Sequence, residues 1–234
     1  MKIDNNKFSI FTICTENYKE CALKTIPSWV KQNNVERIYV YTDFNLEYDS
    51  QKVIVLPIIE KTTDWIKIVG MKCKVLKNIT KMTIENEKLA FIDIDCVIKD
   101  DISEVFENKF DIAVTRFSKK NTINSGVWFV INNDNVKKLA EEWENLQNIY
   151  FERKNGVKAR YSSYSQKSLS EIVHQQYDNK TYLTVLPLSS RKYNHEADNE
   201  ISWAKTVKRD NPKIIHFKGC KWKNEDLFNE LMNF

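Results

Sequence analysis

Two aspartates at the end of an apolar run are the residues of this chain best suited to metal chemistry. The run 89–92 is followed by Asp93 and Asp95, and the i, i+2 spacing points both side chains to the same side of an extended chain. Two carboxylates this close repel each other unless a cation lies between them, and hard oxygen ligands favour Mg²⁺ or Mn²⁺. The sequence therefore predicts a divalent-cation site. The alternative is a pair of surface aspartates at a turn.

The elements that would position these aspartates alternate between strands and helices. Runs of β-branched and aromatic residues predict strands at 8–14, 37–42, 52–59 and 89–92. Apolar residues at helical spacing predict helices over 18–30 and 66–79. This alternation is typical of a mostly parallel sheet covered by helices on both faces, with its binding crevice at the carboxyl ends of the strands.

The pattern changes after the metal-site candidate. Strand signals at 112–115 and 127–131 follow without long helices between them, which indicates a mixed or antiparallel half of an α/β fold. A helix is predicted from Val136 to Leu146, capped by Asn133 or Asp134. Segment 148–163 has no clean period and is expected to be a mobile loop over a site. A helix at 165–176 and strands at 183–186 and 214–217 complete the predicted core.

Composition and length indicate an ordered globular protein. The 234 residues are 42% hydrophobic and 29% charged, with 4 Gly and 4 Pro, which excludes collagen-like, low-complexity and wholly disordered chains. No apolar run approaches the roughly 18–20 residues that cross a bilayer, and the polar first residues do not resemble a signal peptide, so we expect a cytoplasmic protein. The five cysteines include no C-x-x-C pair and are expected to be reduced.

Positive charge is concentrated towards the C-terminus. Residues 151–223 hold 15 Lys or Arg against 7 Asp or Glu, whereas the chain as a whole carries only +4. This basic part is expected to meet an anion, either a phosphate or an acidic membrane surface in peripheral contact. Only 6 of the 36 cations are Arg, so no nucleic-acid partner is expected. The alternative is a set of solvated surface lysines.

Three further segments place polar residues or a glycine next to apolar runs. The first is the turn after the first predicted strand, the second is the segment 123–129, and the third follows the last predicted strand. With only 4 glycines in the chain, the glycine of the second segment is expected to have a specific role. The residues are Thr15, Asn17 and Tyr18 in the first, Asn124 and Gly126 in the second, and His216, Lys218, Gly219 and Lys221 in the third.

In this order the four motifs resemble those of glycosyltransferases of the GT-A fold, in particular the group of glycogenin and the bacterial lipopolysaccharide galactosyltransferases. The resemblance extends from Phe8 to Trp222. It implies a single GT-A domain over 1–234, with a Rossmann-like nucleotide-binding half over about 1–97 and a mixed central sheet. The acceptor and sugar-binding half would cover about 98–234.

The resemblance also implies a role for each motif residue, with a nucleotide-sugar donor as the bound molecule. Asp93, Asp95 and His216 would hold Mn²⁺ or Mg²⁺, Thr15 and Tyr18 would contact the nucleobase, Asn17 the ribose, Asn124 the donor sugar, and Gly219 with Lys218 or Lys221 the diphosphate. Lys72, at the start of the helix before the metal strand, is a further candidate to add positive charge.

Two departures from the family pattern affect these assignments. The family motif is His-x-x-Gly-x-x-Lys-Pro-Trp, but here one residue is missing before the lysine and the proline is absent, so either Lys218 or Lys221 could meet the diphosphate. The family also has Asp-Gln at the start of a helix lining the sugar site, where this chain has Ser165 and Gln166. Gln166 remains a catalytic candidate, whereas any role of the acid is in question.

The expected reaction is a metal-dependent transfer of a sugar from a UDP-sugar donor to a hydroxyl of a glycan or another acceptor. The cation would neutralise the departing diphosphate. The resemblance favours a retaining enzyme. An inverting one would need a carboxylate base, for which Glu171 and Asp198 are available.

Two other classes of protein remain open. Phosphatases of the haloacid dehalogenase type also begin with an apolar strand and Asp-x-Asp, but Gly-Thr normally follows, whereas Cys96 and Val97 follow here. A non-catalytic nucleotide-sugar-binding protein is the second alternative, for which the serine at position 165 is the indication.

Overall fold

The first strand is buried because most of its residues on both faces are apolar. The computed structural model describes residues 7–58, 68, 70–116, 123–152, 162–175, 182–196, 207, 209–218 and 223–232. All seven residues of β1 (Phe8–Cys14) are buried. β1 lies between β2 (Val35–Thr42) and β4 (Lys88–Ile92), and β3 (Val53–Pro57) forms one edge of the sheet. A strand buried on both faces needs a layer on each side of the sheet.

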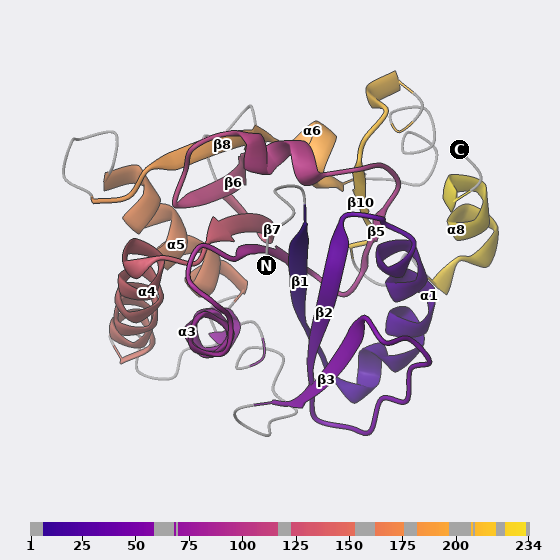
Figure 1. Cartoon of the computed structure of the whole chain (residues 1–234), viewed down its shortest axis with the longest axis horizontal. Coiled ribbons are helices and arrows are strands. Elements are labelled where there is room, and N and C mark those ends of the chain that lie inside the picture. The colour runs from indigo at the N-terminus through magenta and orange to yellow at the C-terminus, as the bar shows by residue number, and fades with distance from the viewer. Residues whose placement is uncertain are drawn as a thin grey trace.

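The central sheet has seven strands in the order β3-β2-β1-β4-β7-β6-β8 (Figure 1). β1 pairs parallel with β2 and β4, and β2 pairs parallel with β3, as the alternating elements predict. β7 (Ile123–Ile131) runs antiparallel to both β4 and β6 (Ile112–Arg116), and β6 pairs parallel with β8 (Val185–Ser189). The mixed second half of the sheet is therefore confirmed. Both predicted halves of the chain contribute strands to the seven-stranded sheet.

Helices cover the two faces of the sheet. α1 (Lys19–Val30) lies on one face, where Ala22, Ile26 and Trp29 pack against the strands. α3 (Lys72–Met82), α4 (Asp134–Glu152) and α5 (Ser162–Gln175) lie on the other face (Figure 1). Asn133 caps α4, since its Oδ1 accepts a hydrogen bond from the amide of Val136 at 2.9 Å. No described helix is both long and apolar enough to cross a membrane.

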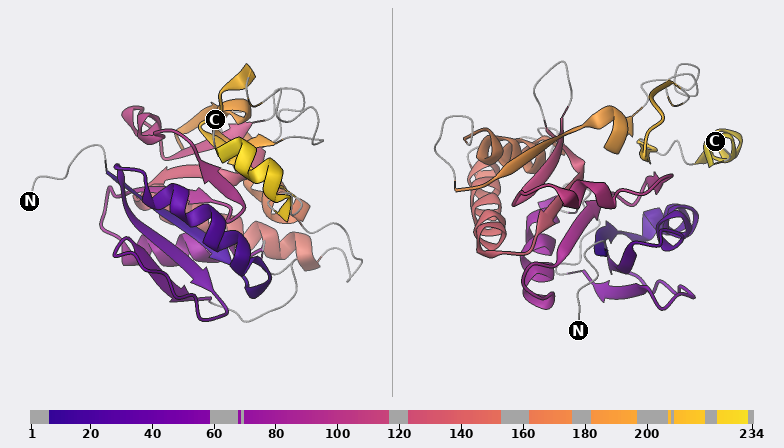
Figure 2. Two further views of the ribbon diagram at one scale, coloured as in Figure 1. Left: turned by 90° about the vertical axis from the view of Figure 1, so that its right-hand side faces the viewer. Right: turned by 45° about the horizontal axis from the view of Figure 1, so that its top comes forward.

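A second, three-stranded sheet lies beside the main one in the order β5-β10-β9. It consists of β5 (Cys96–Ile98), β10 (Ile214–His216) and β9 (His195–Glu196), with η2 (Ser103–Glu107) and α6 (Ser190–Tyr193) nearby in the chain. α8 (Glu225–Met232) lies next to α1, to which the ion pair of Lys24 and Glu225 connects it at 3.1 Å (Figure 2).

Several boundaries differ from the sequence predictions. The segment 148–163 is not a loop throughout, because α4 continues to Glu152 and α5 begins at Ser162. β7 begins at Ile123, earlier than predicted, and the strand expected at 183–186 is β8 at 185–189. The helix predicted over 66–79 is seen at positions 68 and 70 and as α3, while 59–67 and 69 lie outside the described residues. The cysteines at 14, 21, 73 and 96 are buried and take part in no disulfide, whereas Cys220 lies outside the described residues.

Candidate active site

Two short strands bring His216 next to the Asp-x-Asp segment. β5 begins at Cys96, directly after Asp95, and pairs antiparallel with β10, so that His216 lies opposite Cys96. β9 pairs with the other side of β10 and places Glu196 opposite His216. Side chains of opposite residues on neighbouring strands lie on the same face. The small sheet therefore places the imidazole between a thiol and a third carboxylate.

Side chains of α1 hold the backbone of the Asp-x-Asp segment. The hydroxyl of Thr25 donates to the carbonyl of Ile94 at 2.7 Å. The indole N–H of Trp29 donates to the carbonyl of Cys96 at 3.0 Å. All four residues are buried. Because buried backbone carbonyls need partners, these bonds help to fix the conformation in which the two aspartates leave the sheet.

Asp93 is paired with Lys72, the first residue of α3. The ammonium Nζ lies 2.7 Å from Oδ1 of Asp93 and donates to the carbonyl of Ser125 at 2.9 Å. It also lies 4.8 Å from the centroid of the Phe91 ring. The Lys72 side chain is only 7% exposed, so its charge depends on these partners. In this structure Lys72 compensates the charge of Asp93, and its expected contact with the diphosphate stays a prediction.

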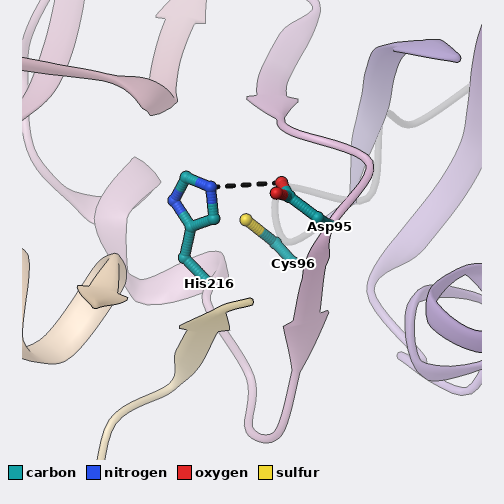
Figure 3. Close-up of side chains that lie close together, drawn as sticks. All are labelled: Asp95, Cys96 and His216. Carbon is teal, nitrogen blue, oxygen red and sulfur yellow. Dashed lines mark ion pairs between the residues drawn. The ribbon is translucent and has the colours of Figure 1, made fainter. Parts of the chain in front are cut away.

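Asp95 and His216 form a buried pair. Nε2 of the imidazole lies 3.1 Å from Oδ1 of Asp95 (Figure 3). Nδ1 donates to Oδ1 of Asn194 at 2.9 Å. The amide of Asn194 donates in turn to the hydroxyl of Thr115 at 3.2 Å. Burial opposes both charges, but the carboxylate and the imidazolium outweigh it: the pKa of Asp95 is lowered and that of His216 is raised. Asn194 orients the ring so that Nε2 faces the carboxylate.

Gly126 leaves room for this group of side chains. A Cβ atom at this position would lie 2.8 Å from Oδ2 of Asp93, 2.9 Å from Cε1 of His216 and 3.0 Å from Oδ1 of Asn124. All three distances are shorter than ordinary van der Waals contacts. The side chains of Asp93 and His216, from separate parts of the chain, therefore meet above a glycine backbone.

Glu196 is a site residue that the sequence analysis missed. Its carboxylate accepts a hydrogen bond from the Asn124 amide, pairs with Nζ of Lys218 at 3.0 Å, and lies 3.6 Å from Nδ1 of His216. The side-chain oxygen Oδ1 of Asn124 accepts a hydrogen bond from the Gly126 N–H at 2.7 Å. No local pattern marks Glu196, because a strand of two residues is too short to produce one.

The donor set suits a hard divalent cation. Oxygen atoms of Asp93 and Asp95 and an imidazole nitrogen of His216 are the ligand types that Mg²⁺ and Mn²⁺ accept. Ligand atoms of Asp95, Cys96 and His216 lie within 4.8 Å of one another, and these side chains converge in Figure 3. Burial raises the pKa of the Cys96 thiol well above its usual range, so the oxygen and nitrogen atoms are the better ligands for a hard cation.

The predicted nucleobase turn has a different degree of burial at each position. Thr15 is buried, Asn17 is exposed, and Tyr18 is half-buried against the core on the α1 side of the sheet. The turn forms η1 (Glu16–Tyr18), and its first amide donates to Oδ1 of Asp43 at 3.0 Å. The carboxyl ends of β1 and β2 are thus joined next to the turn, where a parallel sheet binds ligands.

The acceptor-side candidates lie on α5. Ser165, the residue in place of the family's acid, is 1% exposed, and its carbonyl accepts a hydrogen bond from the Trp143 indole at 2.9 Å. Gln166 is half-buried near the start of the helix. Glu171 is exposed and accepts a hydrogen bond from the hydroxyl of Tyr150 of α4. Glu171 is therefore tied to α4, and its role as a base stays a prediction.

Three candidates lie outside the described residues: Gly219, Lys221 and Asp198. Lys218 is described, and it forms an ion pair with Glu196. The choice between Lys218 and Lys221 as the diphosphate contact therefore remains a prediction.

Known structures share this arrangement of strands and helices. The glycosyltransferase GlyE of Streptococcus pneumoniae TIGR4 matches 97% of this chain at 14% identity with a TM-score of 0.60, and the chain spans 60% of GlyE. The galactosyltransferase LgtC, solved with donor and acceptor sugar analogs, matches 97% of this chain and 95% of its own at 12% identity and a TM-score of 0.56. A glycosyltransferase involved in glycosylation of the major capsid of PBCV-1 matches 95% of this chain and 99% of its own, at 11% identity and a TM-score of 0.61.

These likenesses bear out the predicted GT-A fold, with its mixed sheet of seven strands. No curated protein matches the chain. In sequence, residues 25–227 match the nucleotide-diphospho-sugar transferase family. Because this match covers most of the chain, including the Asp-x-Asp segment and His216, the chain belongs to the nucleotide-diphospho-sugar transferase family.

Proposed function

We propose that this protein is a metal-dependent glycosyltransferase that moves a sugar from a UDP-sugar to a hydroxyl of a glycan or another acceptor. The observation that carries the proposal is the approach of Asp93 and His216 above Gly126, together with the pairing of His216 with Asp95. The position of this group also supports it, because Asp93 follows β4, where parallel pairing with β1 changes to antiparallel pairing with β7.

The chain's own residues have separate tasks in this proposal. Asp93, Asp95 and His216 would hold Mn²⁺ or Mg²⁺, which when bound neutralises charge on the departing diphosphate. Lys72 balances Asp93, and Asn194 keeps the imidazole of His216 in a fixed orientation. The turn with Thr15 and Tyr18 would bind the base.

A retaining reaction is the favoured stereochemistry. It requires no carboxylate base on the acceptor side, and the exposed Glu171 is engaged by Tyr150 of α4. Gln166 and Asn124 are the candidates for contacts with the donor sugar.

Hydrolysis of UDP-sugars with and without Mn²⁺ tests the proposal. We expect slow release of UDP that depends on Mn²⁺, stops with a chelator, and is lost in Asp95→Asn, a variant that keeps the shape of the side chain. Circular dichroism of this variant provides the control for folding. Turnover of p-nitrophenyl phosphate would instead favour the phosphatase alternative, which family membership leaves without support. Donor binding without hydrolysis or transfer would favour a non-catalytic binder.

Peripheral membrane contact through the basic part 151–223 also remains a proposal. Several of its described cations are already paired: Lys192 and Lys213 with Glu104, Arg209 with Asp210, and Lys218 with Glu196. Such pairing reduces the charge available to a lipid surface. Co-sedimentation with vesicles of anionic and of neutral lipids, at low and high salt, measures what remains.

A further inference from the structure

Glu196 lies among the side chains of the candidate site. The side chain is 13% exposed, and its carboxylate contacts the Asn124 amide, the imidazole of His216 and the ammonium of Lys218. A carboxylate with so little exposure is retained only with charged or hydrogen-bonding partners. Glu196 has these partners, and all of them belong to the candidate site.

The three carboxylates of the site differ in how firmly their partners are held. Asp93 is paired with Lys72, which is 7% exposed, and Asp95 with His216, which is 6% exposed. The cationic partner of Glu196 is Lys218, which is 62% exposed. An exposed lysine exchanges partners at little cost in free energy. Glu196 is therefore the carboxylate whose oxygens can most easily turn to a ligand.

The ligand group that reaches Glu196 follows from the chemistry of a nucleotide sugar. Its sugar is bonded directly to the diphosphate, so a diphosphate at the metal residues places the sugar in the adjoining space. Glu196 and His216 are neighbours on paired strands, and Asn124 connects Glu196 with Gly126. Sugar hydroxyls are hydrogen-bond donors, and an ionised carboxylate offers two acceptor oxygens to them.

We propose that Glu196 accepts hydrogen bonds from hydroxyl groups of the donor sugar, and that it thereby selects neutral sugars over sugars that carry a carboxylate. The inference rests on the proposed function and adds the substrate class. The carboxylate of such a sugar would lie next to Glu196 in a partly buried place, where two like charges repel each other. Ser165, which stands where the family has an aspartate, is buried against α4 and supplies no carboxylate to the sugar site.

The test separates the sugar from the nucleotide by calorimetric titration in Mn²⁺. The ligands are UDP, UDP-glucose, UDP-galactose, their N-acetylated forms, and UDP-glucuronate. For Glu196→Gln we expect about tenfold weaker binding of the neutral UDP-sugar that the natural protein binds best. This change corresponds to the loss of one charged hydrogen bond. Affinity for UDP should stay within about twofold. Discrimination against UDP-glucuronate should shrink.

Two further variants distinguish a sugar contact from a structural effect. Lys218→Gln breaks the same ion pair from the other side, and we expect it to leave the difference in affinity between UDP and the UDP-sugar unchanged. Glu196→Asp keeps the charge with a shorter reach, so it should weaken neutral sugars while still disfavouring UDP-glucuronate. It also replaces Glu196→Gln if that variant does not fold.

Each outcome decides the matter. The role of Glu196 would be overturned if Glu196→Gln lost affinity equally for UDP and the UDP-sugar, or lost none. It would also be overturned if the natural protein bound UDP-sugars no better than UDP. All three outcomes leave the proposed function intact. A natural protein that binds neither UDP nor any UDP-sugar would overturn the proposed function, and the inference with it.

Discussion

Gly126 lies so close to Asp93 that a Cβ atom at the glycine would come within 2.8 Å of the carboxylate oxygen Oδ2. The glycine is part of β7, and its carbonyl accepts a hydrogen bond from the amide of Asp93 at 2.8 Å. The backbone at both residues is therefore held, and an added methyl group can be accommodated only by moving site side chains.

Gly126→Ala should weaken metal binding more than it weakens the fold. We expect Mn²⁺ affinity to fall by at least about tenfold, since shifts of supporting groups commonly cost 10- to 100-fold. The free energy of unfolding should fall by about 1–3 kcal/mol from overpacking. Electron paramagnetic resonance titration of Mn²⁺ and urea unfolding measure the two effects. Gly70→Ala is the control, because its Cβ would meet only the end of the flexible Gln147 side chain, at 2.8 Å.

Lys72 and Asp93 should be coupled in stability. Asp93→Asn leaves the buried ammonium without a counter-charge, with only neutral oxygen acceptors such as the Ser125 carbonyl, and we expect a loss of about 1–3 kcal/mol. In the double variant Lys72→Met/Asp93→Asn much of this loss should be recovered, because no unpaired charge remains. Urea unfolding of the four proteins gives the coupling energy. Simple additivity of the two single losses would contradict the pairing.

Thr25→Val should loosen the Asp-x-Asp segment from α1. The change removes the hydroxyl that donates to the Ile94 carbonyl at 2.7 Å while nearly preserving the side-chain volume. We expect a loss of about 1–3 kcal/mol in unfolding free energy and weaker Mn²⁺ binding. Thr80→Val is the matched control, since the hydroxyl of Thr80 bonds to the Leu76 carbonyl of its own helix at 2.9 Å. Metal affinity that falls equally in both variants would refute a specific role for Thr25.

Glu104 should make the stability depend on pH in the acidic range. Partial burial raises its pKa, but hydrogen bonds from Lys192, Tyr193 and Lys213 outweigh burial and lower the pKa to about 2, from 4.5. A lowered carboxyl pKa stabilises the folded state above the unfolded-state pKa, and this contribution disappears as pH falls through the folded-state pKa. Glu104 is 38% exposed, so solvent screens the effect. At neutral pH the natural protein should have a higher melting temperature than Glu104→Gln, and the difference should vanish between about pH 4.5 and 2. A difference in melting temperature that stays unchanged across that range would refute the contribution of Glu104.

The nucleotide turn should favour UDP over GDP by at least about tenfold, which corresponds to roughly 1.4 kcal/mol. Face stacking on Tyr18 contributes about 1–3 kcal/mol to any base, so Tyr18→Ala should weaken both diphosphates alike. Discrimination would come from edge contacts of Thr15 and the nearby backbone, where a wrong base leaves buried polar groups unpaired. Calorimetric titration of UDP and GDP in Mn²⁺ measures both effects. Equal affinities, or a preference for GDP, would show that the turn does not read uracil.

Much of the architecture follows from local sequence patterns. The apolar runs at β1, β2 and β4 and the helical spacing in α1 and α4 predicted these elements, because burial on one or two faces imposes a period on neighbouring residues. The Asp-x-Asp spacing indicated the candidate metal site, because residues two apart on an extended chain point to the same side. Family membership agrees with the resemblance carried by the motifs.

Only the tertiary structure decided which side chains are partners. Lys72 and Asp93 are 21 positions apart, and His216 and Glu196 are 20 apart; neither pairing leaves a periodic trace in the sequence. β5, β9 and β10 have two or three residues each, so their pairing depends on long-range contacts and not on local propensity. The approach of Asp93 and His216 over Gly126 likewise exists only once β4, β7 and β10 have been assembled, because strand register sets which side chains share a face.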